Sequence, residues 1–162
     1  MTASNNQALP RWNVTDVHES LDARSFTDAL ELVGADVERL AVLFDELDIR
    51  STERSIEPAD GDKADRAIAE FNRVSDALNL LDAYVYSIVS TDSRHEHAQA
   101  VMSEINTTGS SLRPLLARLA DWVAALGADE IANVSAEARE HLGPLQRFAE
   151  RAAHQMPEAE EH

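Results

Sequence analysis

The chain has 162 residues, a length that suits one domain with a single core. Its formal net charge of -16 argues against nucleic acids and anionic membranes as partners, because both would repel it. The absence of cysteine excludes disulfide frameworks, thiol nucleophiles and zinc–thiolate sites. Hydrophobic residues make up 44% of the chain but aromatic residues only 5%, which favours an all-α protein of Ala- and Leu-rich helices.

Residues 1–24 are expected to form an irregular lead-in with one short helical turn. Thr15 or Asp16 is a suitable N-cap for that turn, and Trp12 offers an apolar anchor. The start of the chain lacks the basic and apolar regions of a signal peptide, and no apolar run is long enough to cross a bilayer. The sequence therefore predicts a cytoplasmic protein with no membrane segment.

The first long helix is expected to follow Ser25, a plausible N-cap. Apolar residues then recur at alternating spacings of four and three, which is the pattern of one helical stripe: Phe26, Leu30, Val33, Val37, Leu40, Phe44 and Leu47. Pro58 and Gly61 interrupt the pattern and predict an exposed connection. The acids Asp60, Asp62 and Asp65 do not have the spacing of a calcium loop, so we interpret them as solvated loop residues.

Two more long helices follow. The stripe resumes at Ala64 and continues to Ile88, which predicts a helix of about 26 residues and roughly 40 Å. A third helix keeps the same period from Ala98 to Leu126 and is expected to start at residues 90–93. The tight turn between them predicts an antiparallel pair. Gly109 and Pro114 predict a kink within the third helix, because proline lacks the amide donor.

The remaining residues predict a short turn and a fourth helix. Gly127 ends the third helix, the sequence ADEIANVS is expected to be a turn, and a helix begins after Gly143 with Pro144 in its first turn. Residues 25–155 would thus form an antiparallel bundle of about four long helices with short connections. Residues 156–162, MPEAEEH, have the composition of a helix start or of an acidic tail. A helix start would make this chain the front part of a longer polypeptide.

No pattern predicts a catalytic, cofactor or metal site in this chain. His95 and His97 flank Glu96 but are two positions apart, so on a helix they would point roughly 200° apart and could not share an ion. A zinc-protease helix needs a spacing of four. The pairs at that spacing are Glu137 with His141, Glu150 with His154, and Glu158 with His162, which predict weak surface pairs. A di-iron bundle is disfavoured because Glu-x-x-His is absent.

Three segments, in order along the chain, resemble one family. The opening LPRWNVTDVHESLDARSF is similar to the start of oligoendopeptidase F-type zinc peptidases, a branch of the thimet-oligopeptidase-like family. The segment AYVYSIVSTDSRHEHAQ resembles the family's Y-x-Y-x-x-x-x-S-T-D helix end. The piece GPLQRFAERAAHQMPEAEEH resembles a helix that ends in an arginine-rich turn, a histidine and a glutamate-rich helix entrance. Pro157 departs from the serine that relatives place before the final glutamates.

The resemblance implies a non-catalytic N-terminal helical lobe of a metallopeptidase that hydrolyses short peptides in an enclosed channel. Zinc would be held by an H-E-x-x-H helix in the catalytic lobe of the same parent polypeptide, and no position in this chain matches that motif. The lobe would act as a channel wall and a size filter. Tyr84 and Tyr86 are the candidate channel-lining residues, with ordinary packing as the alternative. The other hypothesis for the whole chain is a stand-alone helical interaction bundle with no enzymatic activity.

Overall fold

The computed structural model describes residues 15–155, and side chains from residue 15 to residue 152. Within that range the chain forms helices and no strand, which confirms the all-α prediction. The helices are α1 (Arg24–Glu46), α2 (Ala59–Thr91), α3 (Glu96–Leu126), α4 (Ala128–Val134), α5 (Ala136–Glu140) and α6 (Leu142–Gln155). The expectations for Trp12, Pro157 and the segment 156–162 lie outside the described residues.

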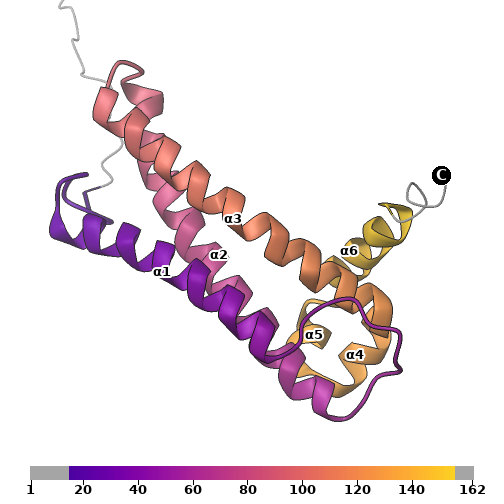
Figure 1. Ribbon diagram of the computed structural model, residues 1–162. Coiled ribbons are helices and arrows are strands. Elements are labelled where there is room, and N and C mark those ends of the chain that lie inside the picture. Colours follow the sequence, from indigo (N-terminus) through magenta and orange to yellow (C-terminus); the bar gives the residue numbers. More distant parts are fainter. Residues whose placement is uncertain (1–14, 156–162) are drawn as a thin grey trace, which may run out of the picture.

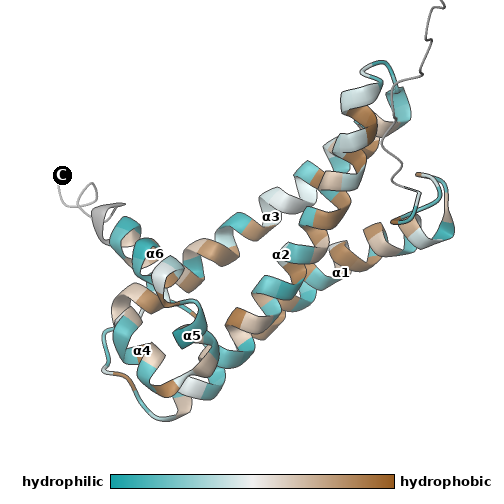
Figure 2. Ribbon diagram, turned by 180° about the vertical axis from the view of Figure 1, so that it is seen from behind, coloured by the Kyte–Doolittle hydropathy of each residue, from teal (hydrophilic) through white to brown (hydrophobic). Residues whose placement is uncertain are grey.

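The three long helices form an elongated bundle (Figure 1). Helices α2 and α3 lie side by side and antiparallel, as predicted, and α1 packs along them. The short helices α4 and α5 and the start of α6 gather at the end where α3 finishes and α2 begins. Figure 2 shows the apolar residues as bands along the helices. The fully buried large side chains of these bands include Trp122, Phe26, Phe44, Leu40, Ile105 and Val74.

Helix α1 starts earlier than predicted and ends in a complete C-terminal cap. Its N-cap is Ala23, and the predicted cap, Ser25, lies in the first turn instead, where its hydroxyl is 3.2 Å from Nδ1 of His18. At the other end Asp48 has a φ of 57°, and the Ile49 amide donates to the Phe44 carbonyl at 2.9 Å. This is a Schellman arrangement, and both Ile49 and Phe44 are fully buried. It places the start of the next connection in the core.

Helix α2 is longer than predicted, since it begins at Ala59 and has 33 residues. The expectation of a start at Ala64 was wrong. The charged residues that resembled a loop form the first turns of the helix, with Pro58 immediately before it. Proline is compatible with a helix start because the first amide groups have no partner within the helix. The acidic side chains in this turn are also stabilised by the positive end of the helix dipole.

Helix α3 is capped by a histidine and continues through its proline. The N-cap is His95, whose Nδ1 accepts a hydrogen bond from the Ala98 amide at 3.2 Å. The expected initiator Asp92 instead accepts from the Arg94 amide at 3.0 Å within the turn between the helices. Pro114 lies inside the helix, which continues without interruption from Glu96 to Leu126. Buried leucines that flank the proline hold the helix against its neighbours.

The segment expected as a short turn is instead two short helices, α4 and α5. Gly127, with a φ of 91°, makes the sharp change of direction after α3. Ile131 and Ala138 are fully buried, which explains why the segment folds back onto the bundle. Between the two helices, Ser135 caps α5 by accepting from the Ala138 amide at 2.9 Å. Within the described residues, no helix is both long and apolar enough to span a bilayer.

Candidate functional site

Tyr84 belongs to the core, at the end of the bundle where α1 begins. Its side chain is 5% exposed, and its hydroxyl donates a hydrogen bond of 3.1 Å to the main-chain carbonyl of His18, 66 positions earlier. Its ring packs against the rings of Phe26 and His18 at centroid distances of 5.4 and 5.1 Å. Burial raises the pKa of the phenol. Of the two interpretations, packing is therefore the one that the structure shows for this tyrosine.

Tyr86 is in a different environment from Tyr84. Its side chain is 64% exposed on the surface of α2. Two positions along a helix correspond to a rotation of roughly 200°, so neighbours at this spacing face opposite sides. Tyr86 remains available to line a channel or to contact a partner, and that role stays a prediction.

We expect the two tyrosines to respond differently to loss of the hydroxyl. Tyr84→Phe removes the bond to the His18 carbonyl and should lower the free energy of unfolding by about 1 kcal/mol. Tyr86→Phe, the matched control on the surface, should change it by less than about 0.5 kcal/mol. Urea unfolding followed by circular dichroism measures both. Equal effects would show that the Tyr84 hydroxyl does not hold the lead-in to the bundle.

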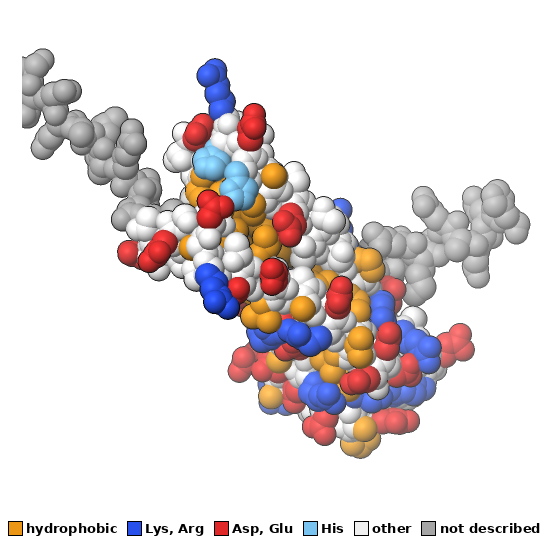
Figure 3. Space-filling model, turned by 60° about the vertical axis from the view of Figure 1, so that its left-hand side comes forward, with side chains coloured by type: hydrophobic (Ala, Val, Ile, Leu, Met, Phe, Trp, Pro, Cys, Tyr) orange, Lys and Arg blue, Asp and Glu red, His pale blue; other side chains and the backbone are white. Residues whose placement is uncertain are grey.

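The histidines His95 and His97 are neighbours and border the same hollow as Tyr84. Figure 3 shows histidine side chains, in pale blue, together near one end of the molecule. Their ring centroids are 6.4 Å apart. The expected opposite orientation of the two rings applied to a helix that contains both residues, whereas His95 precedes the helix as its N-cap. Nδ1 of His97 lies 3.6 Å from a carboxylate oxygen of Asp22. With Thr15, Glu19 and other residues, these side chains border a hollow of about 270 Å³.

No metal site forms among the residues that the structure describes: nowhere do three histidine or acidic side chains converge in a way that could hold an ion. In His95 one ring nitrogen is already occupied by the Ala98 amide. Glu137 and His141 are 3.8 Å apart on the surface, which confirms the prediction of a weak pair. The side chains of the other two predicted pairs include His154 and His162, which lie outside the described side chains.

Buried carboxylates form the most organised polar groups of the molecule. Asp36 on α1 is 3% exposed and pairs with Arg73 of α2 at 2.8 Å and with Arg39. The hydrogen bond from Arg73 lowers the pKa of this carboxyl, with Arg39 adding to the effect against the cost of burial. Arg73 also contacts Glu70 at 2.6 Å. The group joins the first two helices.

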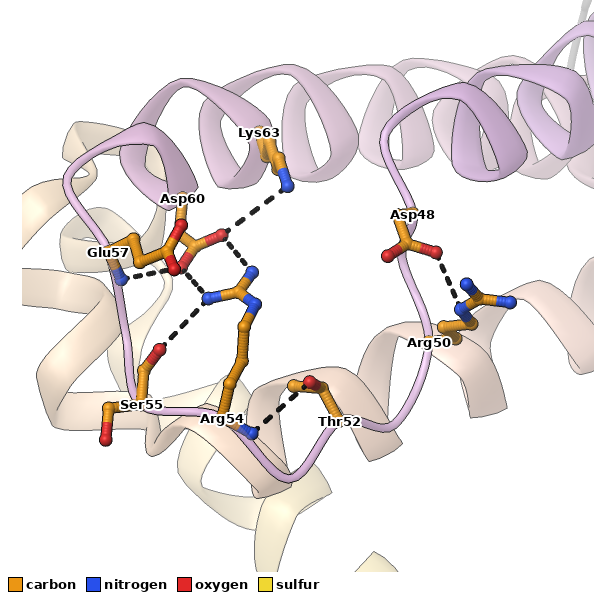
Figure 4. A network of polar contacts seen from close by, with 8 residues as sticks. All are labelled: Asp48, Arg50, Thr52, Arg54, Ser55, Glu57, Asp60 and Lys63. Atoms are coloured by element: carbon orange, nitrogen blue, oxygen red, sulfur yellow. Dashed lines mark hydrogen bonds and ion pairs between the residues drawn. The ribbon is translucent and has the colours of Figure 1, made fainter.

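Asp60 is the most deeply buried of these acids, with no exposed surface. Arg54, from the connection before α2, reaches back and donates to both of its carboxylate oxygens at 2.7 Å (Figure 4). The Glu57 amide donates a third bond at 2.8 Å, and the ammonium group of Lys63 lies 3.7 Å away. The hydrogen bonds from Arg54 lower the pKa of Asp60. A bidentate pair of this kind fixes the connection onto the helix start.

Asp65 joins α2 to the start of α5. Its carboxylate accepts from the Ser135 hydroxyl at 2.6 Å and from the Glu137 amide at 3.0 Å, and the bond from Ser135 lowers its pKa. The interpretation of Asp60 and Asp65 as solvated loop acids was therefore wrong, because both lie on α2 and carry tertiary contacts. Asp62, between them, is exposed as expected.

Each of these acids is held by structural contacts. A general acid at neutral pH needs a raised carboxyl pKa, whereas the shifts here are all downward. Their partners, Arg54, Arg73 and Ser135, could not be found from the sequence, because the contacts join residues on different segments.

A groove runs between α2 and α3 and has a volume of about 440 Å³. The residues that line this groove are Phe71, Ser75, Leu78, Asn79 and Asp82 on α2, and Ile105, Asn106, Gly109, Ser110, Leu112, Arg113 and Leu116 on α3. Helix α6 packs on α3 near one end of the groove, where Phe148, Phe71 and Leu116 line a second, smaller cavity. The middle of the groove is polar at its rim and apolar at its floor. The helical spacing that predicted the core does not reveal it, because its residues lie beside the buried stripe.

Comparison with known proteins adds no relative. No protein-family model matches the chain, and neither a curated protein nor a solved structure does.

Proposed function

We propose that this chain is a non-catalytic N-terminal helical lobe of a zinc-dependent oligopeptidase, and that it serves as a channel wall and size filter. The catalytic lobe of the parent polypeptide would supply the zinc and hydrolyse short peptides. The proposal rests on the three ordered sequence resemblances described above. What the lobe itself offers is a rigid surface made of long helices.

The observation that carries the proposal is a contact between two of the segments that resemble the peptidase family. The opening segment contains His18 and Phe26, and the Y-x-Y-x-x-x-x-S-T-D segment contains Tyr84. The hydrogen bond and ring contacts among these three residues join segments that are far apart along the chain. A shared structural role for the two segments explains why both appear together in one sequence. Leu21, within the opening segment, is also buried and borders the same hollow as Tyr84.

The test is complementation. The reading frame that continues after residue 162 should encode an H-E-x-x-H motif. Purified 1–162 should bind no zinc tightly and leave a quenched short peptide uncut. Adding the catalytic lobe should give zinc-dependent cleavage of short peptides but not of folded proteins. Stoichiometric zinc or cleavage by 1–162 alone would contradict the proposal, as would the absence of any such catalytic reading frame.

A second function is favoured by one observation, the open groove between α2 and α3. A stand-alone interaction bundle would use such a groove to bind another helical surface. It requires no zinc-binding partner and no peptide substrate. The complementation experiment separates the two functions, since an interaction bundle would not change the activity or the substrate range of a catalytic lobe.

A further inference from the structure

Helix α6 lies beside one end of the seam between α2 and α3. There α6 packs on α3, and its Phe148 borders the same small cavity as Phe71 of α2 and Leu116 of α3. Leu145 of α6 is only 3% exposed at this place. Beyond Phe71 and Leu116 the seam continues as the groove, which no described helix covers.

The floor of the groove is apolar and its rim is polar. Leu78, Ile105 and Leu112 are each at least nine-tenths buried and form the floor. Exposed asparagine and serine side chains lie along the rim, including Asn79 and Ser110. This arrangement matches the surface that an amphipathic helix needs, with its apolar stripe on the floor and polar groups at both edges.

The two walls have a fixed register. Gly109 of α3 lies level with Leu78 of α2, because a methyl group added at Gly109 would be 3.3 Å from Cδ2 of Leu78. The helices are antiparallel, so equal steps along the sequence beyond Leu78 and beyond Gly109 lead toward opposite ends of the groove. Asp82 and Arg113 are each four positions beyond these two residues. The two charges therefore lie on opposite walls and about 12 Å apart along the groove.

Within the part of the chain that the structure describes, neither of these charges, Asp82 and Arg113, takes part in an ion pair. A helix that lies in the groove would pass both of them. A separation of about 12 Å corresponds to eight residues of that helix, and residues eight positions apart lie on the same broad face. A partner with a basic residue and an acidic residue at this spacing would satisfy both walls.

The exposed Tyr86 lies at the mouth of the groove. It is four positions beyond Asp82, so the two side chains are neighbours on one face of α2. The tyrosine ring is 64% exposed although it is large and partly apolar. Tyrosine is one of the residues that most often dominate the energy of an interface. A helix that pairs with Asp82 and extends by one further turn would cover this ring.

We propose that the groove binds an amphipathic helix of another polypeptide, in which a basic residue meets Asp82 and an acidic residue eight positions away meets Arg113. Leucine-type side chains between the two charges fill the floor, and Tyr86 packs against the end of the helix. The proposal deepens the second function above, the interaction bundle. It is independent of the peptidase function, because it depends only on the groove of this chain.

The probe is a 16-residue helical peptide based on alanine and glutamine. It carries one arginine, one glutamate eight positions later, and leucines three, four and seven positions after the arginine. A second peptide has the same residues with the arginine and glutamate exchanged, so that either direction of binding is sampled. Fluorescence anisotropy with the full 1–162 chain should give a dissociation constant of about 100 μM or less for at least one peptide.

Charge reversal in the protein tests the two contacts. Asp82→Arg and Arg113→Asp should each raise the dissociation constant at least about tenfold, because each places like charges opposite one another. Tyr86→Ala should also weaken binding by about tenfold. Asp76→Arg is the matched control, since it makes the same charge change on an exposed part of α2 outside the groove and should leave binding unchanged. Circular dichroism should show the same fold for all four variants.

The decisive measurement is rescue by the peptide. A peptide whose arginine is replaced by glutamate should bind Asp82→Arg better than it binds the wild-type protein. A peptide whose glutamate is replaced by arginine should likewise prefer Arg113→Asp. Each replacement should restore only the variant that it matches. A general effect of net charge would make the first peptide prefer Asp76→Arg as well, so equal binding of that peptide to Asp76→Arg and to the wild type is the result that identifies a local contact at Asp82.

Each other outcome contradicts the proposal. The absence of binding at about 1 mM peptide would show that the groove does not accept a helix of this chemistry. Binding that is insensitive to both reversals would place the contact elsewhere on the molecule. Sedimentation of the protein alone gives the remaining outcome: self-association that Asp82→Arg abolishes would mean that a second copy of this chain fills the groove.

Discussion

Asp60→Asn is expected to lower the free energy of unfolding by about 3 kcal/mol at pH 7. Breaking a buried ion pair by removing one charge typically costs about 3–5 kcal/mol, because the remaining charge stays desolvated. Arg54 is 35% exposed, so water screens part of its lost interaction and the lower end of that range applies. Asp62→Asn, the same change at an exposed carboxylate two positions away, should cost less than about 0.5 kcal/mol. Urea unfolding measures both.

The effect of Asp60→Asn should depend on pH in one direction. The pKa of Asp60 is lower in the folded protein than in the unfolded chain, so its stabilising contribution is complete above the unfolded value of about 4. As pH falls below that value the unfolded state binds the proton first, and the contribution is lost. The stability difference between wild type and variant should therefore be largest above about pH 5 and should shrink on acidification. A difference that stays constant down to about pH 3 would show that the charge of Asp60 is not the cause.

Gly61→Ala is expected to be similarly damaging, at about 3 kcal/mol or more. Gly61 lies on the first turns of α2, and an added methyl group would overlap the main-chain carbonyl of Val134 at the end of α4. A backbone atom cannot rotate away as a side chain can, so the helices must move apart and lose packing. Thermal and urea unfolding of the variant should show a lower midpoint.

The control for Gly61→Ala is a second glycine within a helix. Gly34 of α1 has no atom within 4 Å of the position of an added methyl group. Gly34→Ala should therefore stabilise the protein by about 0.5–1 kcal/mol, because alanine loses less conformational freedom in a helix. The same substitution thus has opposite signs at the two sites. Equal effects would mean that the close approach to Val134 does not determine the cost at Gly61.

Periodicity predicted the long helices because their burial follows from local spacing. Every member of the predicted α1 stripe from Phe26 to Leu47 is buried except Leu30, which packs against the core. The antiparallel order of α2 and α3 also followed from the short connection. Such features depend on residues close together along the chain, and a single sequence contains that information.

The start of α2 could not be predicted in the same way. Asp60 and Gly61 are typical of a loop, and they are helical here because Arg54 neutralises one and Val134 packs over the other. Both partners are set by tertiary structure. The histidine cap of α3 was missed for a different reason: serine and aspartate are the usual caps, and both precede His95 within the turn.

In the candidate functional surfaces, too, some features follow from local sequence and others only from tertiary structure. The sequence identified Tyr84 and Tyr86 as a pair, and only the fold shows that one is in the core and the other on the surface. The groove depends on how α2 and α3 lie relative to each other, with Leu78 level with Gly109. That alignment results from packing along the whole length of both helices, so neither helix alone predicts it.

The connection from Leu47 to Pro58 is held near both of its ends, by the buried Ile49 and by the ion pair between Arg54 and Asp60. Arg118 of α3 adds a bond of 3.1 Å to the Ile49 carbonyl. Inserted residues would therefore be tolerated between Arg50 and Glu53, where the side chains are largely exposed. Insertions before or after this stretch would be tolerated poorly. For anyone who wishes to attach a fluorescent label, an affinity tag or a small inserted module, that short stretch is the natural location.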